Sequence, residues 1–196
     1  MITGQFPLSS GTILLEGQAL SGLPPYRIAR TGIARTYQIP RPFAHMTVLR
    51  NVALCAQFGG TDTAGSARFE EEARYWLSFC GLSARAGNVP AELNLRERKV
   101  LELARALAAR PRVLLLDEVM SGLNPAEVDT AIRLVRRIRD QGTTIVFVEH
   151  LMRAVVQLSD RVAVMNEGAV LTVGDPQDVM RDPRVVAIYF GHRHVA

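Results

Sequence analysis

The residues that offer chemistry most directly are Asp117 and Glu118, which follow the apolar run VLLL at residues 113–116. Such a run predicts a buried strand, and α/β proteins bind ligands at the carboxyl edge of their sheet. There, Asp117 could hold the water shell of Mg²⁺, and Glu118 could orient and deprotonate a water that attacks a γ-phosphate. The spacing fits equally well a strand that simply ends at a polar turn, so both interpretations remain open at this point.

Two further polar side chains are expected at the same edge. His150 follows the apolar segment TTIVFVE at 143–149, and Gln38 ends the segment IARTYQ at 33–38. The imidazole could reach the carboxylates, while the amide oxygen of Gln38 could bind Mg²⁺ or accept from a metal-bound water. Each residue alone is more simply explained as a polar residue at the end of a strand. Their combination with Asp117 and Glu118 indicates a site that processes phosphate.

The elements that must position these residues alternate strictly in the second half of the chain. Strands are predicted at 112–117, 143–149, 161–166 and 168–174, with helices at 97–110, 125–142, 151–159 and from 182 onward. Strands rich in Val, Leu and Ile that alternate with amphipathic helices are typical of a mostly parallel sheet. We therefore expect an α/β fold whose sheet is covered by helices on both faces.

The first half is less regular. A strand is predicted at 11–20, a short helix at 24–32, and helices at 47–58 and 67–82, separated by the small-residue loop 59–66. Thr47 can cap the helix that follows it. The section 45–95 therefore contains helices and no predicted strand.

Composition excludes several classes of protein. The 196 residues suit one domain, and no apolar run approaches the roughly 20 residues of a membrane helix. The N-terminus does not resemble a secretory signal, so a cytoplasmic protein is expected. Cys55 and Cys80 lack metal-ligand spacing and are expected to be buried thiols. The net charge of +4 comes from dispersed arginines without interleaved aromatic residues, which argues against nucleic acid as a partner.

Four motifs in order resemble those of ABC ATPases. Gln38 resembles the Q-loop, LNLRERKVLELARALAARP (93–111) the signature helix, VLLLDEVMSGLNP (113–125) Walker B with the D-loop, and VEH (148–150) the H-loop. The segment from GQFPLSSGTI to MTVLRNV and the segment DPRVVAIYFG near the end are similar to ATPases of branched-chain amino-acid importers. The resemblance covers essentially the whole chain.

The resemblance implies a P-loop NTPase-like core as a single domain, 1–196, with a helical subdomain at 45–95 that would receive a coupling helix of the membrane subunit. It implies ATP and Mg²⁺ as cofactors, Glu118 as general base, and His150 as a catalytic contact to the γ-phosphate. Asp117 and Gln38 would form the metal site, and residues 121–124 the D-loop. Residues implied to contact the nucleotide, some across a dimer, are Gln38, Asn94, Arg96, Glu97, Asp117 and Asn124.

Two departures from the family pattern stand out. The signature LSGGQ is replaced by LNLRE, so the glycines that permit close backbone approach are lost. No string GxxxxGK(S/T) occurs, and Lys99 is the only lysine. Because this string supplies the amides and the lysine that hold the phosphates, we expect an N-terminally truncated domain that lacks on the order of 40 residues. Such a chain alone should hydrolyse ATP poorly or not at all.

The resemblance implies an importer subunit that couples ATP binding and hydrolysis to uptake of branched-chain amino acids or similar small polar solutes. Its partners would be a second ABC ATPase subunit, like or unlike, membrane permease subunits and, indirectly, a periplasmic or extracellular solute-binding protein. It would lie in the cytoplasm, peripheral on the inner face of the membrane. The alternative is a non-catalytic degenerate subunit that pairs with an intact paralogue.

Overall fold

A computed structural model of the chain describes residues 1–59 and 66–190. Most of the predicted loop 59–66 and the end of the chain beyond 190 therefore lie outside the described residues. The strands are β1 (Leu14–Leu15), β2 (Gln18–Ala19), β3 (Ile33–Arg35), β4 (Val113–Asp117), β5 (Thr144–Val148), β6 (Val162–Asn166) and β7 (Ala169–Gly174). The α-helices are α1 (Pro25–Arg30), α2 (Val48–Gly59), α3 (Ser66–Phe79), α4 (Leu95–Ala108), α5 (Pro125–Asp140), α6 (Met152–Leu158), α7 (Pro176–Arg181) and α8 (Pro183–Phe190). Two 3-10 turns, η1 (Ser83–Arg85) and η2 (Pro90–Glu92), precede α4.

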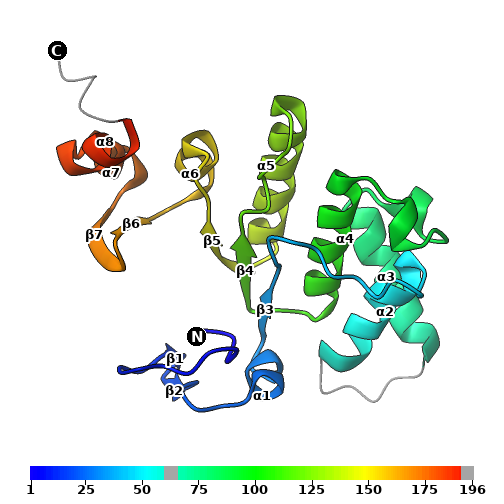
Figure 1. Cartoon of the computed structure of the whole chain (residues 1–196). Coiled ribbons are helices and arrows are strands. Elements are labelled where there is room, and N and C mark those ends of the chain that lie inside the picture. The colour runs from blue at the N-terminus through cyan, green and yellow to red at the C-terminus, as the bar shows by residue number, and fades with distance from the viewer. Residues whose placement is uncertain (60–65, 191–196) are drawn as a thin grey trace.

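The central sheet has the order β3-β4-β5, and both of its pairings are parallel. The remaining strands form two antiparallel hairpins, β1–β2 and β6–β7, which lie apart from the central sheet (Figure 1). The single strand predicted at 11–20 is wrong, because the chain turns back at Glu16 and Gly17. Both residues have positive φ, 48° and 80°, as tight hairpin turns require.

The central sheet is covered unequally on its two faces, contrary to the expectation of helices on both. Because side chains alternate along a strand, Leu114 and Leu116 point into the main core and are buried. On the opposite face, Val146 and Val148 are 49% and 62% exposed. A smaller apolar cluster, supplied by the N-terminal hairpin, α1 and the start of β3, covers Val113 and Leu115 of β4 on that face.

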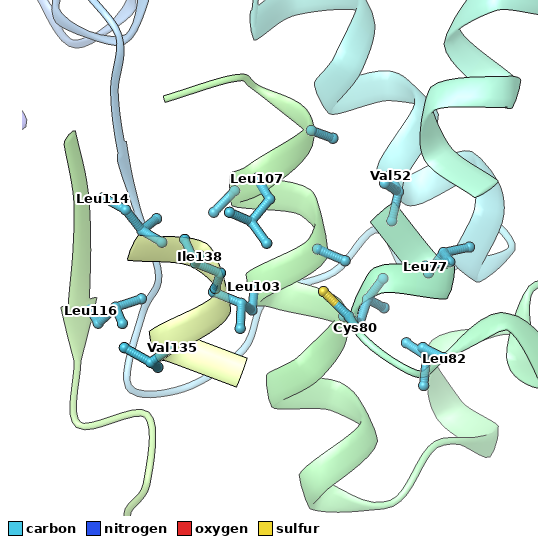
Figure 2. Close-up of a cluster of buried hydrophobic side chains, with 14 of the residues drawn as sticks. Val52, Leu77, Cys80, Leu82, Leu103, Leu107, Leu114, Leu116, Val135 and Ile138 are labelled. Carbon is cyan, nitrogen blue, oxygen red and sulfur yellow. The ribbon is translucent and has the colours of Figure 1, made fainter. Parts of the chain in front are cut away.

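The main core runs without a break from the helical section into the sheet. Val52 and Leu77 of α2 and α3 belong to the same buried cluster as Leu107 of α4, Leu114 of β4 and Ile138 of α5, and Figure 2 shows these side chains with their neighbours. Helix α4 lies between the helical section and the sheet (Figure 1). A displacement of α2 and α3 would therefore act on the sheet through α4.

Helix α2 begins where the sequence predicts, since the Oγ1 of Thr47 accepts from the N–H of Arg50 at 3.2 Å. The predicted section 45–95 contains α2, α3, η1, η2 and no strand among its described residues. That the section 45–95 forms a subdomain stays a prediction. None of the helices in the described ranges is long and apolar enough to span a membrane.

Both cysteines are free thiols. Cys80 is buried, as expected, and burial raises the pKa of its thiol to about 12. Cys55 is only half-buried, because it packs at the margin of the core and not inside it.

Candidate functional site

Gln38 and Glu118 meet at the carboxyl edge of the central sheet. The Nε2 of Gln38 donates to the Oε2 of Glu118 at 2.7 Å, although the two residues are 80 positions apart in sequence. Strand β3 ends at Arg35, so Gln38 lies three residues beyond the strand and not at its end as predicted. The extension carries its amide across the end of β4.

Glu118 lies in a tight turn directly after β4. Its N–H donates to the carbonyl oxygen of Val148 at 3.0 Å, which continues the hydrogen bonding between β4 and β5 by one residue. Its φ is 46°, a left-handed conformation that costs a non-glycine residue about 1 kcal/mol or more. The N–H of Ser121 closes the turn on the carbonyl oxygen of Glu118 at 3.2 Å.

Asp117 pairs with Arg35, a residue that the sequence analysis did not assign. The Nη2 of Arg35 donates to the Oδ2 of Asp117 at 2.6 Å, and both side chains are about one-third exposed. The Arg35 guanidinium also lies 5.2 Å from the ring centre of Tyr37. The pair follows from the register, because Arg35 is opposite Leu115 in the parallel ladder. Residue 117 therefore shares the face of residue 35.

His150 lies at the same edge but outside this network. It is exposed and lies two residues beyond Val148, the partner of Asp117 in the ladder. Within residues 1–59 and 66–190, no hydrogen bond joins it to Gln38, Asp117 or Glu118. The expected common edge is therefore present, without a direct contact of the imidazole.

The donor set at this edge fits Mg²⁺ only if a ligand supplies most of the coordination. The described residues contain no group of three or more His, Cys, Asp or Glu side chains that could hold a metal ion. Asp117 offers one carboxylate, which it shares with Arg35, and Gln38 offers an amide oxygen. Mg²⁺ is commonly bound by one or two carboxylates together with substrate phosphates, so these residues suit a phosphate-held ion.

The predicted nucleotide contacts Asn94 and Asn124 both cap helices. The Oδ1 of Asn94 accepts from the N–H of Glu97 at 2.8 Å, and a Glu97 oxygen accepts from the N–H of Asn94 at 3.0 Å. Asn124 and Glu127 form the same reciprocal pair, with both distances 3.0 Å. The pattern N-x-x-E is a capping box and was readable from the sequence.

The first turn of α4 carries the residues that replace the family signature. The bond from the N–H of Asn94 and a second from Arg85 lower the pKa of the Glu97 carboxyl. Arg96 is half-buried on the same turn. Leu95 lies close to Gly122, since a Cβ at Gly122 would be 3.6 Å from Leu95. The turn after β4 thus packs against the start of α4.

A buried asparagine anchors the segment that joins Gln38 to α2. Asn51 is fully buried in α2. Its Oδ1 accepts from the N–H of Phe43 at 2.8 Å, and its Nδ2 lies 3.0, 3.1 and 3.0 Å from the carbonyl oxygens of Phe43, Met46 and Thr47. A single side chain therefore bonds four backbone groups of this loop.

We expect Asn51→Ala to lower the free energy of unfolding by about 1 to 3 kcal/mol, since it leaves buried backbone groups without partners. Urea denaturation measures the loss, and amide exchange should be faster in residues 39–47 than elsewhere. Asn166→Ala, at an exposed position of β6, should change stability by less than about 0.5 kcal/mol. Equal effects of the two substitutions would contradict the anchoring role of Asn51.

Comparisons with a family model and with known proteins both find similarity to ATP-binding proteins of ABC transporters. A family model described as "ABC transporter" matches residues 1–121. The high-affinity branched-chain amino acid transport ATP-binding protein LivG of Escherichia coli is 36% identical over 203 residues, which cover 97% of this chain and 80% of LivG.

Solved structures agree with the fold. The ADP conformation of MJ1267, an ATP-binding cassette of an ABC transporter, superposes with a TM-score of 0.83 at 28% identity and covers 97% of this chain and 80% of that chain. The dimeric post-hydrolysis structure of the cassette MJ0796, bound to ADP and Pi, has a TM-score of 0.79 at 19% identity, with coverage of 87% and 75%. The second likeness shows the fold alone.

Proposed function

This chain belongs to the ABC transporter family of ATP-binding domains, and from that premise we propose that it is the nucleotide-binding subunit of an importer for branched-chain amino acids or similar small polar solutes. The observation that carries the assignment of the site is the 2.7 Å hydrogen bond from Gln38 to Glu118 at the carboxyl edge of the sheet. The class of solute is supported by the likeness to LivG over 97% of the chain.

In the proposed mechanism Glu118 is the general base for the attacking water. Gln38 orients the Glu118 carboxylate, because its amide donates to one of the two carboxylate oxygens and leaves the other available to accept from water. His150, exposed at the same edge, contacts the γ-phosphate. Mg²⁺, when bound with ATP, neutralises charge on the phosphates, and Asp117 and Gln38 are the residues that would hold it.

Arg35 binds the carboxylate of Asp117 that the proposed Mg²⁺ would use. The Arg35 guanidinium lies 2.6 Å from the Asp117 carboxylate and neutralises the negative charge that would attract Mg²⁺. Since both side chains are partly exposed, this pair is worth at most about 1 kcal/mol. The contact is therefore weak enough for a phosphate-held cation to displace it.

We further propose that ATP is enclosed between two cassettes. This arrangement is what the resemblance of the four motifs to those of ABC ATPases implies, and the cassette MJ0796, which shares the fold, was solved as a dimer bound to ADP and Pi. Asn94, Arg96, Glu97 and Asn124 would then face the nucleotide of the partner. The Nδ2 groups of the two asparagines, which have no hydrogen bond within residues 1–59 and 66–190, remain able to donate to it. The pair would dock on membrane permease subunits at the inner face of the membrane, which work in turn with a solute-binding protein.

The sequence contains no string GxxxxGK(S/T), and the contacts of Lys99, its only lysine, support the view that this residue does not take the place of the missing one. Its Nζ donates to the carbonyl oxygens of Glu118 and Ser121. We therefore propose that these 196 residues alone do not hold ATP and that a strand-loop-helix unit with the cradle must be supplied beside the sheet. In the described part of the chain β5 pairs only with β4, and the exposed Val146 and Val148 leave a surface for such a unit.

The test compares Mg²⁺-dependent binding of a fluorescent ATP analogue to the chain and to a chimera that carries a GxxxxGK(S/T) strand-loop-helix unit ahead of residue 1. We expect the chimera to bind at least about 100-fold more tightly, a difference of about 2.8 kcal/mol. Binding by neither protein would favour the degenerate partner subunit. Mg²⁺-dependent turnover by the 196-residue chain, abolished by Glu118→Gln, would contradict the proposed inactivity.

A further inference from the structure

The only lysine of the chain reaches from α4 to the turn that carries Glu118. The Nζ of Lys99 lies 3.3 Å from the carbonyl oxygen of Glu118 and also donates to the carbonyl oxygen of Ser121. These two carbonyls belong to the first and last residues of the turn, which the N–H of Ser121 closes. One ammonium group therefore bridges both ends of the turn.

Glu149 holds the same turn from the side of β5. It is the first residue after that strand, and its Oε1 accepts from the N–H of Met120 at 2.9 Å. Its Oε2 is buried and has no hydrogen-bond partner in the part of the chain that the structure describes. A carboxylate in such a place needs nearby positive charge to stay ionised.

Lys99 and Glu149 influence each other's ionisation. Burial lowers the pKa of the Lys99 ammonium, and the carboxylates of Glu149 and Glu118 oppose that change. Burial raises the pKa of the Glu149 carboxyl, opposed by the bond from Met120 and by the charges of His150 and Lys99, while Glu118 adds to the rise. The two groups thus form one electrostatic unit around the turn.

We propose that Lys99 and Glu149 are positioning residues, a clamp that holds the turn Glu118–Ser121 in the conformation that presents the Glu118 carboxylate to Gln38. The clamp is needed because Glu118 has a φ of 46°, which the backbone leaves when nothing holds it. Three backbone groups of the turn are bound by the two side chains. The importance of this clamp for catalysis rests on the proposed role of Glu118 as general base.

The single lysine permits a direct test in the chain itself. Protein labelled with ¹⁵N and ¹³C in lysine gives one side-chain signal, whose pH titration reports the pKa of Lys99. Glu149→Gln removes the charge but keeps an acceptor for the N–H of Met120. We expect it to increase the acid dissociation constant of Lys99 about two- to fivefold. The matched control Glu71→Gln, at an exposed position of α3, should leave the titration unchanged. An unchanged titration in Glu149→Gln would overturn the coupling.

Amide exchange tests whether the clamp holds the turn. Lys99→Met removes the ammonium at similar length, and exchange at Met120 and Ser121 should become about tenfold faster or more, as expected when a hydrogen bond to a charged group is lost. Lys99→Arg should restore it to within about threefold. Equal exchange in Lys99→Met and the original chain, or no rescue by arginine, would refute the clamp. If the Lys99→Met variant does not fold, amide exchange in the Lys99→Arg variant and the titration of Lys99 in the Glu149→Gln variant test the clamp instead.

A functional arm uses the ATP-hydrolysing chimera. Lys99→Met should lower kcat about tenfold with little change in nucleotide affinity, and Lys99→Arg should recover most of it. Normal kcat in Lys99→Met would count against positioning of Glu118. A chimera that binds ATP but never hydrolyses it would count against the proposed function and leave the exchange and titration results of the clamp standing.

Discussion

Replacement of Glu118 by glutamine is expected to slow ATP hydrolysis about 10²- to 10⁴-fold in the chimera that carries a phosphate-binding loop. The amide has nearly the same size and can still hydrogen-bond with Gln38, which lies 2.7 Å from the carboxylate. The amide cannot take a proton from water, so only the rate of the hydrolysis step should decrease. Affinity for Mg²⁺-ATP should stay within about threefold, because the lost interaction is made in the transition state alone.

Release of phosphate in a single turnover measures this effect, and equilibrium binding of a fluorescent analogue measures affinity. Glu71→Gln, which removes an exposed carboxylate from α3, is the matched control and should hydrolyse ATP at the unmodified rate. Retention of more than about one-third of the rate by Glu118→Gln would exclude Glu118 as the base. The exposed imidazole of His150 would then be the first residue to test.

Replacement of Leu114 by alanine is expected to lower the free energy of unfolding by about 3 to 4 kcal/mol. Leu114 is fully buried in β4, the middle strand of the central sheet, and contributes to the core shared by the helical section and the sheet (Figure 2). Its loss leaves a cavity that rigid neighbours on both sides cannot fill.

The matched control lies on the opposite face of the neighbouring strand. Val146→Ala in β5 removes two methyl groups from a side chain that is 49% exposed and should cost less than about 1 kcal/mol. Urea denaturation of both variants gives the comparison. Similar losses would show that the sheet buries its two faces equally, against the observed exposure. In the chimera, Val146→Ala should cost more than in the chain if the added unit covers this face.

Local sequence patterns determined most elements of the second half and the edge at which the chemistry is placed. The run VLLL before Asp117 and the run TIVFV before Glu149 and His150 consist of aliphatic, β-branched and aromatic residues, so they predict strands β4 and β5 without knowledge of their neighbours. Parallel strands end at one edge, and this alone predicted that Glu118 and Gln38 would approach each other. The structure confirms that approach.

Other features depend on contacts between distant residues and could not be derived from local pattern. Side chains alternate between the two faces of β5, but the sequence does not indicate whether a second layer of structure covers the outer face. The exposure of Val148 could therefore not be predicted. The hairpin at Glu16 was also missed, because its turn depends on two successive positive φ angles. The helix caps at Asn94 and Asn124 follow from a local pattern, whereas the family resemblance implies nucleotide contacts for the same two residues.

The charges and contacts around Glu118 and Gln38 depend on the tertiary structure alone. Arg35 meets Asp117 across 82 positions, and Lys99 meets Ser121 across 22; neither pair has a spacing that a helix or strand would mark. Glu149 precedes His150 in the sequence, and no local pattern indicates that its Oε1 accepts from the N–H of Met120. The sequence determines which groups can do chemistry, because residue type and local period set strands and their ends. Which charges surround those groups depends on register, burial and the packing of α4 on the turn, and these exist only in the folded chain.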